Sequence, residues 1–198
     1  MIAVIDYNAG NTASVGNALD QLGQRYKITG DPEEIARADK IIFPGVGAAG
    51  PAMETLKKRG IDQILRKTKT PVLGICLGLQ LLFKKSDESP EADGLDIYPG
   101  RVGIFKSRGI KIPHMGWNSV SLKTKHPLLK GIADGSYFYF VHSYYAVPKD
   151  PALAAGFCRY GTEDFTAILG TDTAFATQFH PEKSQADGLR MLRNFGQL

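Results

Sequence analysis

This chain contains few cysteines, and their number and spacing exclude one class of protein. The 198 residues include two, Cys76 and Cys158, which lie far apart in the sequence. Small secreted domains compensate for a limited core with several disulfides, so two distant cysteines argue against that class. With 43% apolar residues, the chain is long enough to bury a core of its own.

Long hydrophobic runs and a large excess of charge of one sign are also absent. A membrane-spanning helix needs about 18 or more consecutive apolar residues. The best candidate, Val72–Phe83, is shorter and includes two glycines and a glutamine, and no basic segment opens the chain as in a signal peptide. The 24 Lys and Arg against 20 Asp and Glu are scattered. We therefore expect a soluble, cytoplasmic protein that binds neither a membrane nor nucleic acid.

In the first 85 residues, short apolar runs alternate with amphipathic segments of helix length. The predicted strands are Ile2–Ile5, Arg25–Thr29, Lys40–Phe43 and Val72–Ile75. The predicted helices are Asn11–Leu22, one that begins at Asp31, Pro51–Lys67, and one that starts over Leu77–Lys84. Strands separated by helices are typical of a parallel sheet with helices on both faces.

From about residue 86 the pattern changes, because short apolar runs lie among Gly, Pro, Ser and Asn. This composition favours antiparallel strands and long loops. A strand over Thr173–Phe179 and a last helix capped by Ser184 complete the predicted elements. We therefore predict one domain over residues 1–198, with a flavodoxin-like three-layer α/β/α fold. Its central sheet would be mainly parallel, with an antiparallel extension in the second half.

The strand Val72–Ile75 runs directly into Cys76, where a helix is predicted to begin. Gly74-x-Cys76-x-Gly78 has the form of a nucleophile elbow in which Cys replaces Ser. A sharp strand-to-helix turn leaves no room for a Cβ on its neighbours, which accounts for the two glycines. The turn places the sulfur at a helix N-terminus, where thiolate is favoured. A small buried structural cysteine is the alternative interpretation.

A catalytic thiolate needs a base, and His180 is the best placed of the four histidines. It follows the last predicted strand, and Glu182 lies two positions on, so both side chains face the same side of an extended chain. Cys76, His180 and Glu182 are thus predicted to act as nucleophile, base and orienting carboxylate. The other histidines are interpreted as one surface residue in a basic turn, His126, and two buried structural residues, His114 and His142.

Gly45-x-Gly47-x-x-Gly50 follows a predicted strand and also matches a dinucleotide-binding fingerprint. That interpretation requires an acidic residue about 20 positions further on, at the end of the next strand. Residues 66–75 contain none, and no His, Cys and acidic residues have the spacing of a metal site. We therefore predict no cofactor and no metal, and interpret the N–H groups of Gly45–Gly47 as facing an oxyanion.

Three ordered segments together resemble the signatures of class I (triad) glutamine amidotransferases: Pro44-Gly45-Val46-Gly47, Gly74-Ile75-Cys76-Leu77-Gly78-x-Gln80 and His180-Pro181-Glu182. Other segments resemble the glutaminase subunits of imidazole glycerol phosphate synthases, which act in histidine biosynthesis: Asp6–Asn11, Ile112–Asn118, Tyr139–Tyr144 and Lys183-Ser184. The resemblance covers essentially the whole chain, whose length suits a free-standing glutaminase subunit.

The resemblance implies hydrolysis of the side-chain amide of L-glutamine to glutamate and ammonia through a thioester on Cys76. His180 and Glu182 would complete the triad. The oxyanion hole would be formed by the N–H groups of Val46 and Leu77. The residues implied in glutamine binding are Gly45, Gly47, Gln80, Ser143 and Tyr144.

The resemblance also implies a partner, because ammonia released into neutral water becomes mostly ammonium. The expected partner is a cyclase subunit with a (β/α)₈ barrel, which forms a heterodimer with this chain and receives the ammonia through a channel. The implied interface residues are Asn11, Trp117, Asn118, Tyr139 and Lys183. The isolated chain is expected to be nearly silent until a ligand on the partner activates it, as fits an oxyanion loop that rests in the wrong orientation.

Other interpretations remain open from the sequence. Glutaminase subunits of other synthases share the triad. A stand-alone Cys hydrolase or peptidase on the same fold would need no partner, and peptide cleavage by the purified chain would favour it. A binding or regulatory domain without catalysis would leave Cys76 unlabelled by a glutamine-analogue electrophile.

Overall fold

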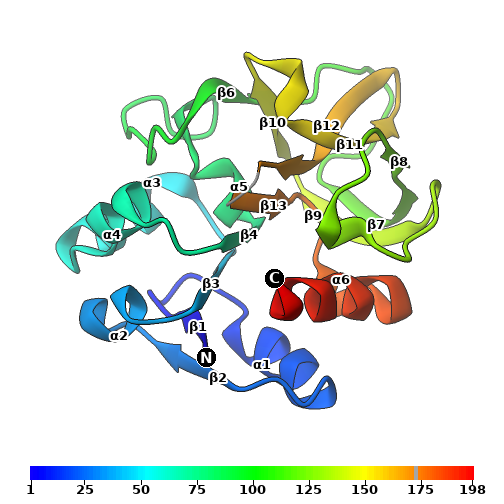
Figure 1. The fold of residues 1–198 in the computed structure, drawn as a ribbon. Helices are drawn as coiled ribbons and strands as arrows, with labels where there is room; N and C mark the ends of the chain where they lie inside the picture. The colour runs from blue at the N-terminus through cyan, green and yellow to red at the C-terminus, as the bar shows by residue number, and fades with distance from the viewer. Residues whose placement is uncertain (172–173) are drawn as a thin grey trace.

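The computed structural model describes residues 1–171 and 174–198. Within them, a sheet of eight strands has the order β2-β1-β3-β4-β13-β12-β11-β8 (Figure 1). Its parallel part consists of β1 (Ile2–Ile5), β2 (Tyr26–Thr29), β3 (Lys40–Gly45), β4 (Val72–Cys76) and β13 (Ala174–Thr177). Its antiparallel part consists of β12 (Glu163–Gly170), β11 (Ala154–Tyr160) and β8 (Ser121–Leu122). The predicted mainly parallel sheet with an antiparallel extension is confirmed.

Helices cover both faces of this sheet. On one face, α1 (Thr12–Gln21) and α6 (Gln185–Gln197) share a buried apolar cluster with the strands. On the other face, α2 (Pro32–Ala36), α3 (Ala49–Lys58) and α4 (Ile61–Lys67) contribute to a second cluster (Figure 1). Alternate residues of β1 enter the two clusters, as expected for a strand whose side chains point to opposite faces. The fold is therefore the predicted three-layer α/β/α arrangement.

Two small sheets flank the main one in the second half of the chain. β5 (Phe83–Ser86), β6 (Tyr98–Ile104) and β10 (Tyr144–Pro148) form one of them, and β7 (His114–Ser119) pairs antiparallel with β9 (Tyr137–His142) in the other. Short 3₁₀ turns, η1 (Pro127–Leu129), η2 (Pro151–Leu153) and η3 (Pro181–Lys183), join these elements. The sequence predicts antiparallel strands here, but not their division among three sheets.

Two predicted helices have different bounds in the structure. The helix expected over Pro51–Lys67 is divided into α3 and α4, because Gly60 adopts φ 71°, a left-handed conformation that interrupts a helix. The helix expected from Leu77 is α5 (Leu77–Gln80), and it is short because the chain returns as β5. In the strand expected over Thr173–Phe179, Thr173 lies outside the described residues, and the described strand β13 ends at Thr177.

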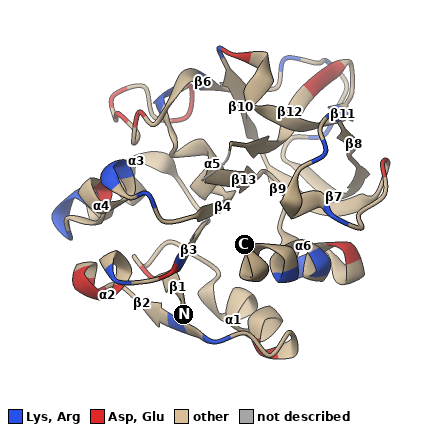
Figure 2. Ribbon diagram, viewed as in Figure 1, with Lys and Arg blue, Asp and Glu red and all other residues tan. Residues whose placement is uncertain are grey.

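The charged residues are interspersed over the outer helices and loops, whereas β4, β13 and α5 at the centre carry none (Figure 2). None of the helices in the described residues combines the length and apolar character that a membrane crossing requires. The uncharged centre of the sheet is where the predicted nucleophile lies.

Candidate active site

Cys76 lies at a sharp turn between the central strand β4 and α5. Its backbone has φ 56° and ψ −108°, a conformation that residues with side chains rarely adopt. A Cβ added at Gly78 would lie 2.0 Å from the carbonyl oxygen of Phe43, and one at Gly74 would lie 3.0 Å from that of Gly78. The packing at this turn therefore excludes a side chain at Gly78 and leaves little room for one at Gly74, for the steric reason that the sequence suggests.

His180 reaches the same edge of the sheet from the neighbouring strand. β13 runs parallel to β4 with Thr177 opposite Ile75, so the chain beyond β13 passes close to Cys76. Nδ1 of His180 lies 2.7 Å from Oε1 of Glu182, and the two side chains are 3% and 1% exposed. Because a carboxylate accepts hydrogen bonds, Glu182 holds Nδ1 as the donor.

The main chain around His180 is fixed by β9 and by Ser184. The His180 N–H donates to the Tyr139 carbonyl at 2.9 Å. The Ser184 hydroxyl donates to the His180 carbonyl at 2.6 Å and accepts from the Tyr139 N–H at 3.0 Å. Ser184 is the N-cap residue of α6, as predicted, but its side chain makes no capping hydrogen bond. It ties the turn that carries His180 to β9 instead.

The environment of His180 raises its pKa to about 10. Burial lowers this pKa, but hydrogen bonding and charge from Cys76 and then Glu182 outweigh burial. Nε2 of His180 is buried and lacks a well-directed hydrogen-bond partner within the described part of the chain. Cys76 nevertheless lies near enough to contribute to the raised pKa of His180. A basic imidazole beside a cysteine can accept the thiol proton, as nucleophilic attack requires.

Cys76 and His180 line one cavity of about 380 Å³. Its lining includes most of the residues predicted to form the oxyanion hole or bind glutamine: Val46, Gly47, Leu77, Gln80, Ser143 and Tyr144. A larger hollow of about 670 Å³, lined by residues 122–127 and 129–132, contains no predicted site residue. The smaller cavity is therefore the candidate active site.

The segment after β3 does not present the predicted oxyanion donor. The Val46 N–H donates to the carbonyl of Ala9 at 2.8 Å, so it is not offered to an oxyanion in the cavity. Gly45, predicted to bind substrate, does not line the cavity, and a Cβ there would lie 2.6 Å from the hydroxyl oxygen of Tyr7. Gly47 has φ 90°, which favours glycine. This conformation withholds one of the two predicted donors.

Gln80 is buried and held by its side-chain amide. Its Nε2 donates to the Tyr144 carbonyl at 2.8 Å and to Oε1 of Gln178 at 3.2 Å. Nε2 of Gln178 lies 3.8 Å from the Cys76 sulfur. The predicted binding residues Gln80 and Tyr144 therefore form one hydrogen-bonded wall of the cavity, beside the nucleophile.

Four residues of the cavity lining were not predicted as site residues: Glu88, Pro113, Val141 and His142. Two of them, Glu88 and His142, carry polar side chains. Glu88 accepts a hydrogen bond from the Ala49 N–H at 2.8 Å, and no local pattern in its turn-rich segment singles it out. His142, expected to be structural, is indeed buried. Its Nδ1 lies 2.9 Å from the Tyr144 carbonyl oxygen and its Nε2 lies 3.1 Å from Nδ1 of His114. Both residues place polar groups on the cavity wall.

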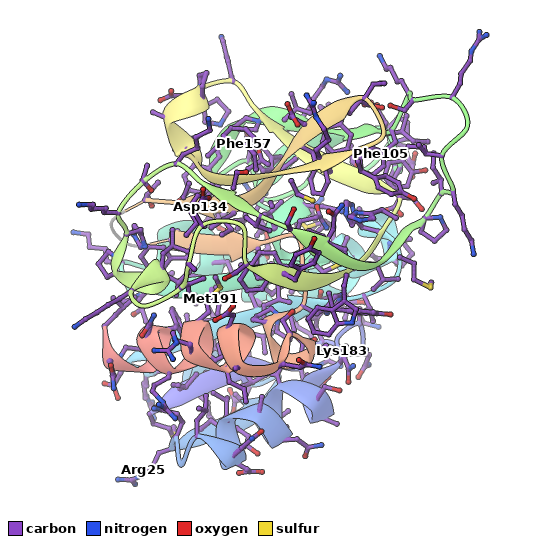
Figure 3. The ribbon with its side chains drawn as sticks, turned by 90° about the vertical axis from the view of Figure 1, so that its right-hand side faces the viewer. Arg25, Phe105, Asp134, Phe157, Lys183 and Met191 are labelled. Carbon is purple, nitrogen blue, oxygen red and sulfur yellow. The ribbon has the colours of Figure 1, made fainter. Side chains whose placement is uncertain are left out.

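The predicted interface residues divide into two sets. Trp117 lies opposite Tyr139 in the β7–β9 register, their ring centroids are 6.2 Å apart, and Trp117 is 45% exposed. Lys183 is exposed on η3, which packs beside β9 (Figure 3). Asn11 caps the start of α1, and Asn118 donates to a main-chain carbonyl of β11. The first three therefore share a surface, whereas the two asparagines already have partners within the fold.

Comparison with known proteins agrees with this geometry. Residues 3–197 match the family model described as glutamine amidotransferase class-I. The chain belongs to the class-I glutamine amidotransferase family. It is 47% identical, over the full length of both chains, to imidazole glycerol phosphate synthase subunit HisH 1 of Methanococcus maripaludis. It is 48% identical to subunit HisH of Moorella thermoacetica, over 100% of this chain and 94% of that one.

Solved structures share the fold at lower sequence identity. One, described as a putative GMP synthase subunit from Thermoplasma acidophilum, has a TM-score of 0.77 at 21% identity, over 99% of this chain and 92% of that one. Another, described as a glutamine amidotransferase, has a TM-score of 0.76 at 18% identity, over 98% and 97% of the two chains. These similarities support the three-layer fold described above.

Proposed function

We propose that this chain is the glutaminase subunit of an imidazole glycerol phosphate synthase. It hydrolyses the side-chain amide of L-glutamine and passes the ammonia to a cyclase subunit in histidine biosynthesis. The observation that carries this proposal is that the strained elbow cysteine and His180 line one cavity, with His180 held by the buried Glu182. The full-length similarity to subunits named HisH supports the choice of synthase.

The reaction begins with attack of the Cys76 thiolate on the side-chain carbonyl of glutamine. The oxyanion that forms is stabilised by the Leu77 N–H. The Val46 N–H becomes a second donor once the Gly45–Val46 peptide turns over. One such donor lowers the reaction barrier by about 3 kcal/mol. His180, oriented by Glu182, protonates the departing ammonia. It then activates a water molecule that hydrolyses the γ-glutamyl thioester.

The rest of glutamine requires groups that recognise an amino acid. The backbone at Ser143 and Tyr144 binds the α-carboxylate, and Gly47 lies at the same end of the substrate. The Glu88 carboxylate, which faces the cavity, complements the α-ammonium group. Gln80 orients the wall against which the substrate lies.

The partner surface is the outward side of β7 and β9. Met115, Trp117 and Tyr137 are 58%, 45% and 61% exposed, and Tyr139 lies among them. Alternate residues of paired strands share one side, so these form a contiguous apolar patch, next to Lys183 on η3. We infer that the cyclase, a (β/α)₈ barrel, binds here, so that ammonia moves between sites without exposure to solvent.

The decisive experiment compares the two free cysteines in the presence of the cyclase from the same source and its nucleotide ligand. Cys76→Ala is expected to lower glutaminase activity by about 10⁴-fold or more, because the nucleophile is lost. Cys158→Ala is the matched control. Cys158 is also buried, and burial and then the charge of Asp164 raise its pKa to about 12, so its thiol is unreactive.

Glutamate release and ammonia-dependent cyclase product are measured for both variants. Normal turnover by Cys76→Ala would exclude the proposed mechanism. Full activity of the wild-type chain without the cyclase would exclude the coupled function and favour a stand-alone hydrolase.

A further inference from the structure

Tyr7 holds a buried hydroxyl whose position the proposed mechanism does not yet explain. The side chain is fully buried, its ring packs on Phe43 at 5.5 Å between centroids, and its hydroxyl has no hydrogen-bond partner in residues 1–171 and 174–198. Buried hydroxyl groups almost always have a partner, since an unmade hydrogen bond is costly. An unpartnered one indicates a group that acts in another conformation.

The Tyr7 hydroxyl lies beside Gly45, whose carbonyl belongs to the peptide that carries the predicted oxyanion donor. A Cβ built on Gly45 would lie 2.6 Å from the hydroxyl oxygen, so this oxygen occupies the space beside the Gly45 Cα. Gly45 is paired with Cys76 in the β3–β4 register. Any residue larger than glycine at position 45 would displace the tyrosine hydroxyl.

The Gly45–Val46 peptide has its N–H on the side of the loop that carries Tyr7 and Ala9. The Val46 N–H donates to the Ala9 carbonyl at 2.8 Å. In a trans peptide the N–H and C=O groups point in opposite directions. The Gly45 carbonyl therefore points away from Ala9 in this conformation.

Presentation of the Val46 N–H to an oxyanion requires this peptide to turn over. This rotation of the peptide directs the Gly45 carbonyl toward the loop of residues 7–9, where the Ala9 carbonyl is also an acceptor. Two facing acceptors repel, so the turned peptide needs a donor on that side. Tyr7 provides one, and burial, with the charge of Cys76 as a further cause, raises the pKa of Tyr7 and keeps its proton in place.

We propose that Tyr7 is a positioning residue for the oxyanion hole, whose hydroxyl donates to the Gly45 carbonyl when the Gly45–Val46 peptide turns to present the Val46 N–H. The inference rests on the proposed glutaminase function and deepens it. In the conformation described here the Val46 N–H is paired and the Tyr7 hydroxyl is not; in the turned conformation the pairing is exchanged. The hydroxyl thus lowers the cost of leaving the inactive state.

The test is Tyr7→Phe, which removes only the hydroxyl oxygen. In the complex with the cyclase and its nucleotide ligand, kcat for glutamine hydrolysis is expected to fall about tenfold, with KM for glutamine within about twofold of wild type. The thermal unfolding midpoint is expected to stay unchanged or rise, because an unpaired buried hydroxyl is removed.

Alkylation of Cys76 by iodoacetamide separates positioning from general damage to the site. This displacement at carbon forms no oxyanion, so its rate is expected to be the same in wild type and Tyr7→Phe. Tyr98→Phe is the matched control, since its hydroxyl is paired with Thr171 Oγ1 at 3.1 Å. It is expected to lower the unfolding midpoint slightly and to leave kcat unchanged.

Wild-type kcat in Tyr7→Phe would overturn the inference while the glutaminase function stands. A parallel fall in kcat, alkylation rate and unfolding midpoint would also overturn it, because Tyr7 would then be merely structural. Absence of glutamine hydrolysis by the wild-type complex would be recognised separately, and would remove the proposed function and this inference together.

Discussion

His180 and His142 line the same cavity and are both buried, but their pKa values are shifted in opposite directions. His180 has a carboxylate at 2.7 Å, and its pKa is raised to about 10 despite burial. His142 faces a carbonyl and a second imidazole, and burial, with the charges of His114 and His180 adding to it, lowers its pKa to about 3. Burial alone therefore does not decide the charge of an imidazole here; the charge of its hydrogen-bond partner does.

The hydrogen bonds around His142 also fix its proton. Nδ1 of His142 must donate to the Tyr144 carbonyl, so its Nε2 accepts from Nδ1 of His114. Nε2 of His114 is then the acceptor for the side-chain amide of Asn118 at 3.2 Å. These hydrogen bonds form an imidazole chain that runs in one direction, from Asn118 through His114 and His142 to the Tyr144 carbonyl at the cavity wall. It requires both imidazoles to be neutral. Burial lowers the pKa of His114 to about 4, in agreement.

The largest effect is expected from removal of the Glu182 carboxylate, which distinguishes His180 from His142. Glu182→Gln is expected to lower kcat about 10³–10⁴-fold, or roughly 4–5.5 kcal/mol, because His180 loses its orienting charge. The same change lowers the pKa of His180, so the alkaline limb of the kcat profile moves to lower pH. The measurement is glutaminase activity of the cyclase complex across pH.

Glu163→Gln is the control for Glu182→Gln. The Glu163 carboxylate accepts hydrogen bonds from Lys106 and Ser107 and from the Tyr145 hydroxyl, and does not contact His180. This variant is expected to lose stability without moving the alkaline limb. An unchanged profile in Glu182→Gln would show that the carboxylate does not set the charge of His180.

A smaller effect is expected in the pH dependence of folding stability, where His114 and His142 contribute with one sign and His180 with the other. The folded-state pKa values of His114 and His142 lie below the unfolded value of 6.5, so the unfolded chain binds more protons in acid. Stability is therefore lost as the pH falls from about 6.5 toward 4, by up to roughly 1.4 kcal/mol per pH unit for each histidine. The contribution of His180 is present below 6.5 and is lost as the pH rises through about 10.

Urea unfolding between pH 5 and 9, with imidazole nitrogen NMR, measures these contributions. His142 is expected to remain a neutral Nδ1–H tautomer at pH 5, and His180 to remain protonated at pH 8. Glu182→Gln should reduce the alkaline contribution and leave the acid one intact. Titration of His142 near 6.5 would contradict the account of the imidazole chain.

The residues around the nucleophile show which features of the site local sequence encodes and which it does not. The elbow at Cys76 depends on local sterics, since Gly74 and Gly78 leave room for a turn, and the His180–Glu182 pair depends on two residues of separation. Both are local and were predictable. Glu88 and the hydrogen bond of the Val46 N–H depend on contacts with distant segments, residues 49 and 9. No pattern within a few residues encodes such contacts.

The same reason explains why the Ser184 side chain makes no capping hydrogen bond, although Ser184 occupies the predicted N-cap position. A serine hydroxyl satisfies whichever backbone groups lie nearest, and the fold brings β9 and the His180 carbonyl within its reach. The antiparallel strands were predictable from composition, but their assignment to three sheets was not. That assignment depends on which apolar faces remain to be covered after the parallel sheet forms.

The smallest expected effect concerns the outer side of β7, whose inner side carries the imidazole chain. Trp117 points outward between Gly116 and Asn118, so Trp117→Ala removes partner contact area without touching His114. Binding of the cyclase is expected to weaken about tenfold, roughly 1.4 kcal/mol, because an exposed aromatic anchor is lost. The His142 tautomer should not change, which would separate the two sides of the strand.

Titration calorimetry of each variant with the cyclase measures this effect. Ile28→Ala is the matched control, because Ile28 is a similarly exposed apolar residue, 39% accessible, on the edge strand β2 at the far end of the main sheet. Equal weakening by both substitutions would mean that the β7–β9 patch is not the docking surface. Weakening by Trp117→Ala together with a change in the His142 tautomer would mean that the two sides of β7 are coupled, and that partner binding reaches the cavity through the imidazole chain.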